Sequence, residues 1–81
     1  MNPRVINVTP TNNYELILEF ENGEIKKFDI KPYLNKGIFK RLKNKEEFKK
    51  VRPFLGSICW EGGQDLCPDT LYEDSIPYTE A

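Results

Sequence analysis

Apolar residues between positions 14 and 20 recur at every second position, which places them on one face of an extended strand. They are Tyr14, Leu16, Leu18 and Phe20. A second extended segment spans residues 25–30, and Asn22 and Gly23 lie between the two segments. This pair favours a type I′ turn, because both residues tolerate positive φ. The pattern therefore predicts a β-hairpin over residues 14–30.

Further extended segments are predicted on both sides of the chain's middle. Residues 4–8 are rich in β-branched side chains and stop before Pro10, so they form a first strand whose pairing partner the sequence leaves open. Residues 57–60 form a short strand, and the glycine pair at 62–63 turns the chain back along residues 65–66. We expect these two segments to form a second, shorter hairpin.

Short helices are predicted between and after the strands. Pro32 suits the first position of one helical turn. Pro68 begins another helix, in which Asp69 places negative charge at the positive end of the helix dipole. After Gly37, one helical face is indicated by the spacing of Ile38, Phe39 and Leu42.

The segment that follows carries the clearest helix signals. Asn44 is a typical N-cap residue, and it precedes a predicted helix over residues 45–51 that Pro53 stops. Phe48 and Val51 face inward in this helix, so its basic residues are exposed. Those residues are Lys45, Lys49 and Lys50.

The predicted fold is one α+β domain over residues 1–81, a small antiparallel sheet built from two hairpins with two or three short helices. Leu, Ile, Val and Phe make up 22 of the 81 residues, which is enough for the chain to fold. Residues 74–81 are acidic and contain Pro77, so we expect a frayed tail. A chain this short buries only about 60–65% of its unfolded surface, so a homo-oligomer is one expected way to cover more.

The cellular compartment follows from what the sequence lacks. No apolar segment is long enough for a signal peptide or a membrane span, so we expect a cytoplasmic protein without a membrane partner. There the only two cysteines, Cys59 and Cys67, stay reduced. We expect both to be small buried hydrophobic side chains, and a disulfide across a hairpin with a three-residue loop is the alternative.

Charge is unevenly distributed, although thirteen acids and twelve bases nearly cancel. Residues 36–52 contain eight bases and two acids, a net of +6, whereas residues 57–81 contain six acids and no base, a net of −6. Fields of opposite sign on one small body orient it toward a charged partner, unless the two segments neutralise each other.

Polar and aromatic residues gather around the predicted second hairpin and the helix after it. The candidate contact residues there are Trp60, Asp65, Asp69 and Tyr72. The structural alternative is that Trp60 and Tyr72 pack, Asp69 stabilises its helix and Asp65 fixes the turn. A divalent ion at the two carboxylates would need a third ligand, and the chain has no histidine, no phosphate-binding loop and no nucleophile elbow. We therefore expect no cofactor, no metal and no enzymatic activity.

Four motifs occur in order along the chain. They are Phe20-Glu21-Asn22-Gly23, Phe28-Asp29-Ile30, Phe39-Lys40-Arg41-Leu42 and a long motif that begins at Trp60 and ends at Tyr72. With these motifs the chain resembles, over nearly its whole length, the bacterial family called domain of unknown function twenty-four forty-two. The last motif is long enough to be specific.

The resemblance implies a compact α+β fold and no established activity. Some relatives carry an added helix-turn-helix domain, and others stand beside a second small domain in arrangements that look like toxin–antitoxin pairs. Because this chain ends at Ala81, we expect no added domain and no DNA binding that depends on one.

The expected function is that of a small non-catalytic module that binds a protein partner, with an antitoxin-like or regulatory role. The basic residues that would attract this protein partner are Lys40, Arg41, Lys45 and Lys49. The surface from Trp60 to Tyr72 is the alternative contact. A nucleic-acid-binding module that uses the basic segment 36–52 is the rival, because Lys and Arg on an outer helix face neutralise phosphates.

Overall fold

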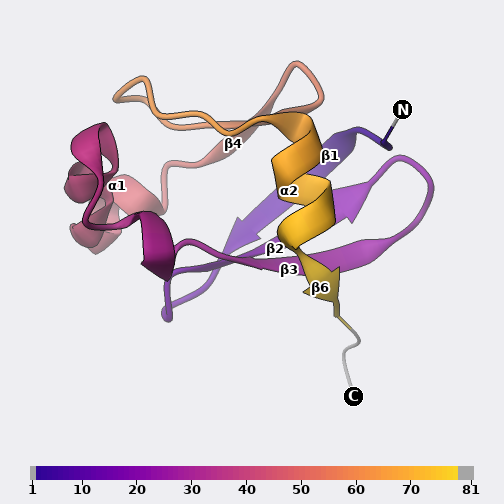
Figure 1. Ribbon diagram of the computed structural model, residues 1–81, viewed down its shortest axis with the longest axis horizontal. Coiled ribbons are helices and arrows are strands. Elements are labelled where there is room, and N and C mark those ends of the chain that lie inside the picture. The colour runs from indigo at the N-terminus through magenta and orange to yellow at the C-terminus, as the bar shows by residue number, and fades with distance from the viewer. Residues whose placement is uncertain (1, 79–81) are drawn as a thin grey trace.

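The computed structural model describes residues 2–78 and contains a four-stranded antiparallel sheet (Figure 1). Its strands, in sheet order, are β1 (Val5–Pro10), β2 (Glu15–Phe20), β3 (Ile25–Asp29) and β6 (Ile76–Pro77). The predicted hairpin over residues 14–30 is confirmed, and β1, whose partner was open, pairs with β2. With its short helices the chain has the predicted α+β fold.

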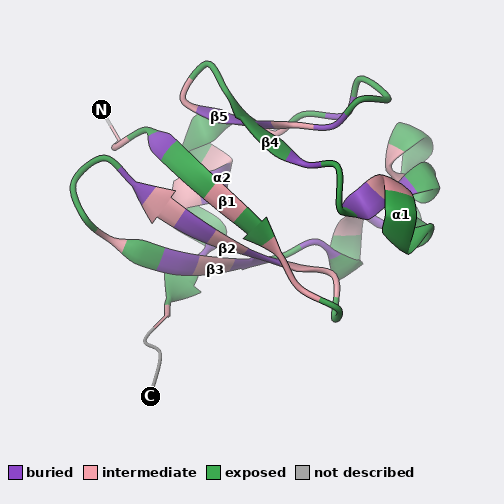
Figure 2. Ribbon diagram, turned by 180° about the vertical axis from the view of Figure 1, so that it is seen from behind, coloured by how far each residue is buried: buried purple, intermediate pink, exposed green. Residues whose placement is uncertain are grey.

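The two-residue period of β2 buries one face of the sheet. Leu16, Leu18 and Phe20 are almost fully buried. Leu16 lies directly opposite Phe28 of β3, so both side chains point to the same side. Helix α2 (Pro68–Asp74) covers that side, and no other described element crosses in front of the opposite face (Figure 2).

Lys26 fixes α2 to the sheet. Its side chain is largely buried, and its Nζ donates to the Tyr72 carbonyl at 2.8 Å and lies 3.9 Å from the centroid of the Tyr72 ring. The same ring meets Phe20 edge-on at 5.1 Å. A cation at the last carbonyls of a helix is favourable, because those carbonyls lack backbone donors and lie at the negative end of the helix dipole.

The turn between β2 and β3 differs from the predicted type I′ turn. The Gly23 N–H donates to the Phe20 carbonyl at 3.0 Å and the Phe20 N–H donates to the Glu24 carbonyl at 2.9 Å, so the loop has three residues. Only Gly23 has positive φ there, because Asn22 accepts a bond from the Glu24 N–H through Oδ1 at 3.0 Å and keeps an ordinary backbone conformation. The type I′ prediction is wrong at this turn.

The second hairpin uses other residues than predicted. Strand β4 (Arg52–Phe54) pairs with β5 (Ser57–Cys59) in a separate two-stranded sheet. The predicted turn is also present, because the Trp60 N–H donates to the Gln64 carbonyl at 2.9 Å and the Gly63 N–H donates to the Trp60 carbonyl at 3.1 Å. Beyond this turn, the predicted strand partners form a single bridge, between Cys59 and Asp65. Pro53 contributes to the formation of β4, since a proline disfavours helical conformation in the residue before it and the chain is already extended at Arg52.

The helix predicted over residues 45–51 is shorter than expected, and two of the other short helices are 3₁₀ helices. The segments η1 (Lys31–Tyr33) and η2 (Gly37–Lys43) are 3₁₀ helices, and α1 (Lys45–Phe48) is a single α-helical turn. Asn44 is the predicted N-cap, because its Oδ1 accepts from the Glu46 N–H at 2.9 Å. Phe48 and Val51 are buried as predicted, although α1 ends before Val51.

One residue of the face predicted for η2 is misplaced. Leu42 is buried and Phe39 packs against the core, but Ile38 is 55% exposed. A 3₁₀ helix has three residues per turn, so Phe39 and Leu42 line up and the preceding residue points elsewhere. The prediction that Ile38 shares one helical face with Phe39 and Leu42 is therefore wrong.

The C-terminal part is more ordered than predicted. Ile76 of β6 pairs with Lys27 of β3, and the Tyr78 N–H donates to the Ile25 carbonyl at 3.0 Å. The frayed-tail prediction is therefore wrong for residues 76–78, and its last part, 79–81, lies outside the described residues. Within residues 2–78, no helix has the length and apolarity that crossing a membrane would need.

The tight turn between β4 and β5 generates a stability prediction. Leu55 and Gly56 have φ of +49° and +83°, a type I′ geometry that costs a residue such as leucine about 1–2 kcal/mol. Asparagine tolerates this region better. We predict that Leu55→Asn raises the free energy of unfolding by about 1 kcal/mol, measured by urea denaturation.

Two control variants separate strain from hydrophobic exposure at this turn. Leu55→Ala removes the apolar side chain but keeps Cβ, so its stability should stay within about 0.5 kcal/mol of the parent. Gly56→Ala should be destabilised, because its Cβ would lie 2.9 Å from Arg4 Nε. A gain in Leu55→Ala equal to that in Leu55→Asn would contradict the strain account.

Candidate functional site

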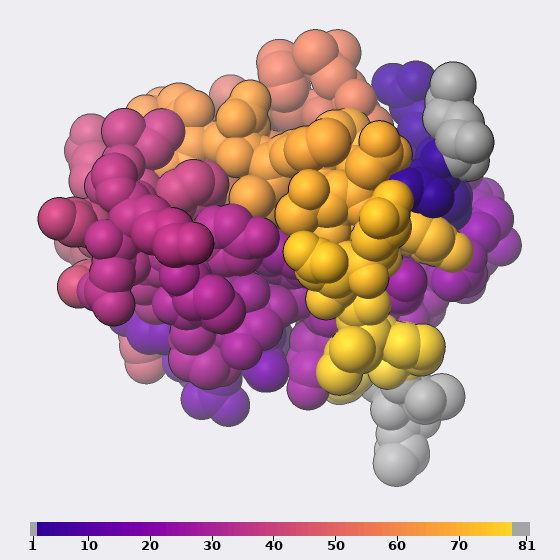
Figure 3. Space-filling view, viewed as in Figure 1, coloured from indigo at the N-terminus to yellow at the C-terminus, as the bar shows by residue number. Residues whose placement is uncertain are grey.

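Residues 36–52, which we call the basic end, form one end of the molecule, at the left of the view in Figures 1 and 3. The segment contains η2, α1 and the first residue of β4. All eight of its basic side chains are exposed: Lys36, Lys40, Arg41, Lys43, Lys45, Lys49, Lys50 and Arg52. Of the four predicted contact cations, Lys40 and Arg41 lie on η2, Lys45 begins α1 and Lys49 directly follows it, and the two helices pack together.

Three side chains from outside the basic end hold it in place by donating to its backbone carbonyls. The bonds run from Gln64 Nε2 to Ile38 (2.8 Å), from Trp60 Nε1 to Phe48 (2.9 Å), and from the Tyr14 hydroxyl to Lys43. Helices this short leave carbonyl groups without an intrahelical donor. The side-chain donors supply the missing bonds and set where the cations stand.

The basic and acidic segments do not cancel by direct pairing. Lys50 is the only base of the basic end that forms ion pairs with described residues, to Glu47 at 3.6 Å and to Glu61 at 3.7 Å. The contact with Glu61 is the single ion pair between the two segments within residues 2–78. Most of the positive charge of the basic end is therefore available to another molecule.

Trp60 is not a contact residue, and this candidate is corrected. Its side chain is 2% exposed, its Nε1 is bonded to the Phe48 carbonyl, and its ring stacks on Phe48 at 6.2 Å. The structural alternative holds for this residue. The predicted surface from Trp60 to Tyr72 is thus divided, with Trp60 in the core beneath α1.

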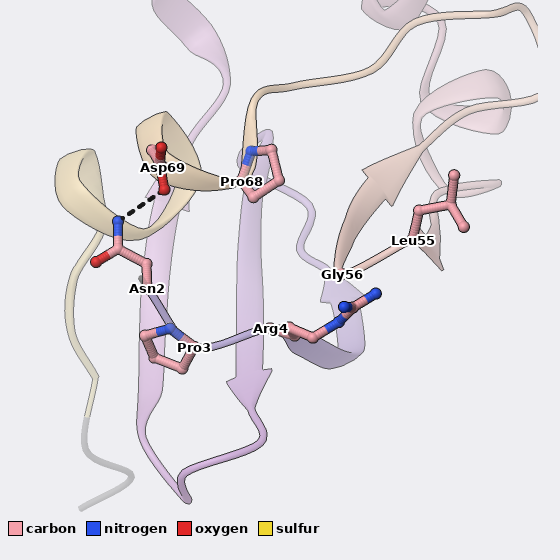
Figure 4. A pocket seen from close by; sticks show the side chains of 7 residues that line it. All are labelled: Asn2, Pro3, Arg4, Leu55, Gly56, Pro68 and Asp69. Carbon is pink, nitrogen blue, oxygen red and sulfur yellow. Dashed lines mark hydrogen bonds between the residues drawn. The ribbon is translucent and has the colours of Figure 1, made fainter.

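Asp65 and Asp69 are both exposed but line different hollows. Asp65 lines a hollow of about 150 Å³ beside Phe54 and Leu66. Asp69 lines one of about 180 Å³ and accepts a hydrogen bond from Asn2 Nδ2 at 3.1 Å (Figure 4). The two carboxylates do not form one site. Within residues 2–78, no group of three or more acidic, cysteine or histidine side chains is arranged to hold a metal ion.

Tyr72 is half-buried and its hydroxyl donates to Glu24 Oε1 at 2.6 Å. This bond, and then one from the Asn22 amide, holds the pKa of Glu24 below its usual value. The same bond raises the pKa of Tyr72, because the phenol must give up its donated proton to ionise beside a carboxylate. Tyr72 therefore fastens α2 to the β2–β3 turn.

The cysteines are both free thiols. Cys59 is half-buried, and Cys67 is exposed just before α2. The prediction of a buried side chain is therefore wrong for Cys67. Its position as the N-cap residue of α2 explains the exposure, because a cap residue lies at the outer end of its helix.

The sequence pattern missed the apolar residues that are exposed beside the charges. Ile38 stands within the basic end, and Phe54 and Leu55 form the tip of the β4–β5 hairpin. Periodicity placed Ile38 on one face with Phe39 and Leu42 because it assumed α-helical spacing. The hairpin tip escaped notice because its turn pair is Leu-Gly instead of Asn-Gly.

A model of the family described as "Protein of unknown function (DUF2442)" matches residues 5–77. The chain belongs to this family. The match includes all six strands and all the helices described above, and it confirms the resemblance that the sequence motifs indicated. No curated protein and no solved structure matches the chain. As a DUF2442 member, the chain takes no established activity from its family.

The Glu24–Tyr72 bond gives a pH-dependent prediction. A carboxyl group whose folded pKa is lowered adds stability above its unfolded pKa, and this stability is lost as pH falls through the folded value. Tyr72→Phe should therefore raise the pKa of Glu24 toward its usual value, measured by carboxyl NMR titration. The stability difference between parent and variant should be present at pH 7 and shrink below about pH 4.

Tyr33→Phe is the matched control, because it also removes one phenol hydroxyl and leaves the Glu24 bond intact. Its Glu24 titration should coincide with that of the parent. An unchanged Glu24 pKa in Tyr72→Phe would show that the bond does not persist in solution.

Proposed function

We propose that the chain is a small, non-catalytic, cytoplasmic protein-interaction module that binds an acidic protein partner through its basic end. The observation that carries the proposal is the 55% exposure of Ile38 beside Lys40 and Arg41. An apolar side chain within a polar, charged rim is a common arrangement in protein–protein interfaces.

Unpaired charge supports the same proposal. Apart from Lys50, the bases of the basic end make no ion pair within residues 2–78. Cations arranged in this way raise the association rate of a negatively charged partner and suppress wrong partners. An antitoxin-like or regulatory role, with a second small protein as the partner, is the specific form that the family resemblance suggests.

The non-catalytic part of the proposal rests on the side chains present. The chain has no histidine, and the two candidate carboxylates, Asp65 and Asp69, line separate hollows. General acid–base work needs groups that reach the same reacting atoms.

Nucleic-acid binding by the same cations is the second candidate, because eight exposed bases at one end suit phosphate contacts. The aromatic rings at this end favour the protein partner instead. Phe39 and Phe48 each pack against Trp60, and Tyr14 packs against Phe48. Base stacking would need rings that are free of such contacts.

We predict that the tagged full-length chain retains one stoichiometric protein from its native cell extract after nuclease treatment. Reversing Lys45→Glu and Lys49→Glu together should weaken binding to that protein at least about tenfold, because the attraction becomes repulsion. Ile38→Asp should weaken it at least as much by removing the apolar contact. Calorimetric titration with the purified partner measures both effects.

The matched control reverses Lys27→Glu and Lys31→Glu, which changes the net charge equally but lies outside the basic end. This variant should bind with nearly the parent affinity. Partner affinity that survives both the Lys45/Lys49 reversal and Ile38→Asp would overturn the proposal. Material that disappears entirely on nuclease treatment, together with nucleic-acid affinity that falls steeply with salt, would establish the nucleic-acid candidate instead.

A further inference from the structure

The tip of the β4–β5 hairpin is the most exposed apolar part of the described chain. Leu55 is 77% exposed and Phe54 is 49% exposed. Leu55 also has φ of +49°, a conformation in which glycine or asparagine would be favoured. The position therefore carries a residue that is unfavourable both for solvation and for the backbone, which indicates a use outside the folded monomer.

Two hollows flank this tip. Leu55 and Pro68 line both of them, so the hollows are neighbours. One continues to Pro3 and Asp69, and Figure 4 shows it between the N-terminal segment, the hairpin tip and the start of α2. The other continues past Phe54 to Leu66. The walls are mostly apolar, and we call this surface the tip groove.

The rim of the tip groove is acidic. Asp65 belongs to one hollow and Asp69 to the other. Glu73 stands next to Asp69, since both accept from Asn2 Nδ2, at 3.3 Å and 3.1 Å. Arg4 is the only basic side chain that lines either hollow. The groove therefore suits an apolar side chain flanked by cations.

The chain itself presents such a side chain at its basic end. Ile38 protrudes next to Lys36, Lys40 and Arg41, all of them exposed. In Figures 1 and 3 the basic end lies at the left and the hairpin tip at the top, to the right of centre. The Ile38 side chain, which we call the knob, and the tip groove therefore lie at separate places on one molecule. The knob can enter a tip groove only if that groove belongs to a second copy.

We propose that the tip groove of one copy binds the Ile38 region of a second copy, so that the chain associates head to tail. Apolar contact between Ile38 and Leu55 supplies the centre of this interface, and the lysines and arginine of the basic end face Asp65 and Asp69. An interface between two different surfaces of the same chain is heterologous, so each copy offers one working surface of each kind. A protein partner at the basic end would compete with the second copy for Ile38.

Sedimentation equilibrium of the purified full chain, from about 10 µM to 1 mM, tests this inference. The average mass should rise above the 9.5 kDa of one chain as concentration increases, and the rise should weaken in 0.5 M salt. Ile38→Asp and Leu55→Asp should each weaken association at least about tenfold. Aspartate tolerates positive φ better than leucine does, so Leu55→Asp should remain folded.

Mixing the two variants is the decisive measurement. Ile38→Asp keeps a working groove and Leu55→Asp keeps a working knob, so an equimolar mixture should associate again and stop at a one-to-one dimer. Ile76→Asp is the matched control, because Ile76 is 57% exposed but belongs to neither surface, and it should associate as the parent does.

A mass that stays at that of one chain up to 1 mM would overturn the inference. So would a mixture of the two variants that remains monomeric, or either variant that associates as strongly as the parent. The test uses purified protein alone, so its failure leaves the partner proposal standing, and failure of the partner proposal leaves this result unchanged.

Discussion

Carbonyl groups that the short helices cannot pair internally are bonded by side chains from distant parts of the chain, and the arrangement of the whole molecule depends on this. Helices of three, seven and four residues have few complete backbone bonds. Gln64, Trp60 and Tyr14 donate to the basic end. Lys26 does the same for the last turn of α2. These bonds add to the side-chain packing and to the Tyr72–Glu24 bond that hold the helices on the sheet.

These side-chain bonds are accompanied by unusual backbone features at Tyr14 and Gly62. Tyr14 adopts φ of +58° at the start of β2, where its hydroxyl reaches the Lys43 carbonyl. Gly62 has no side chain where a Cβ would lie 2.8 Å from Gln64 Oε1, so the glycine lets Gln64 stay buried beneath the turn. Several residues of the long motif from Trp60 to Tyr72 therefore form hydrogen bonds that hold the fold together. Its carboxylates Asp65 and Asp69 are exposed on the surface.

The surface that results has two different poles. At the basic end an apolar side chain is surrounded by cations, and at the hairpin tip apolar side chains are bordered by carboxylates. Because one ion pair joins the two segments directly, each pole keeps most of its charge. A small domain with such poles is suited to oriented binding, either of a charged partner or of another copy.

The sequence by itself determined the elements whose signals are local. The period-two pattern of β2, the Asn44 cap, the proline that begins α2 and the segregation of charge could all be read from neighbouring residues, because each depends on interactions within a few positions. The family motifs belong to this group as well. The α+β class followed from the same local signals.

Only the tertiary structure decided which segments meet. Strand β5 pairs with β4 over Arg52–Phe54 and makes a single bridge to Asp65. Ile38 is exposed because the helix there is 3₁₀, and its carbonyl accepts a bond from Gln64, 26 residues away. Trp60 is buried because it bonds and stacks against Phe48, which lies 12 residues earlier in the chain. Periodicity and charge order do not encode such long-range contacts, and for that reason the two poles of the surface became visible only in the folded chain.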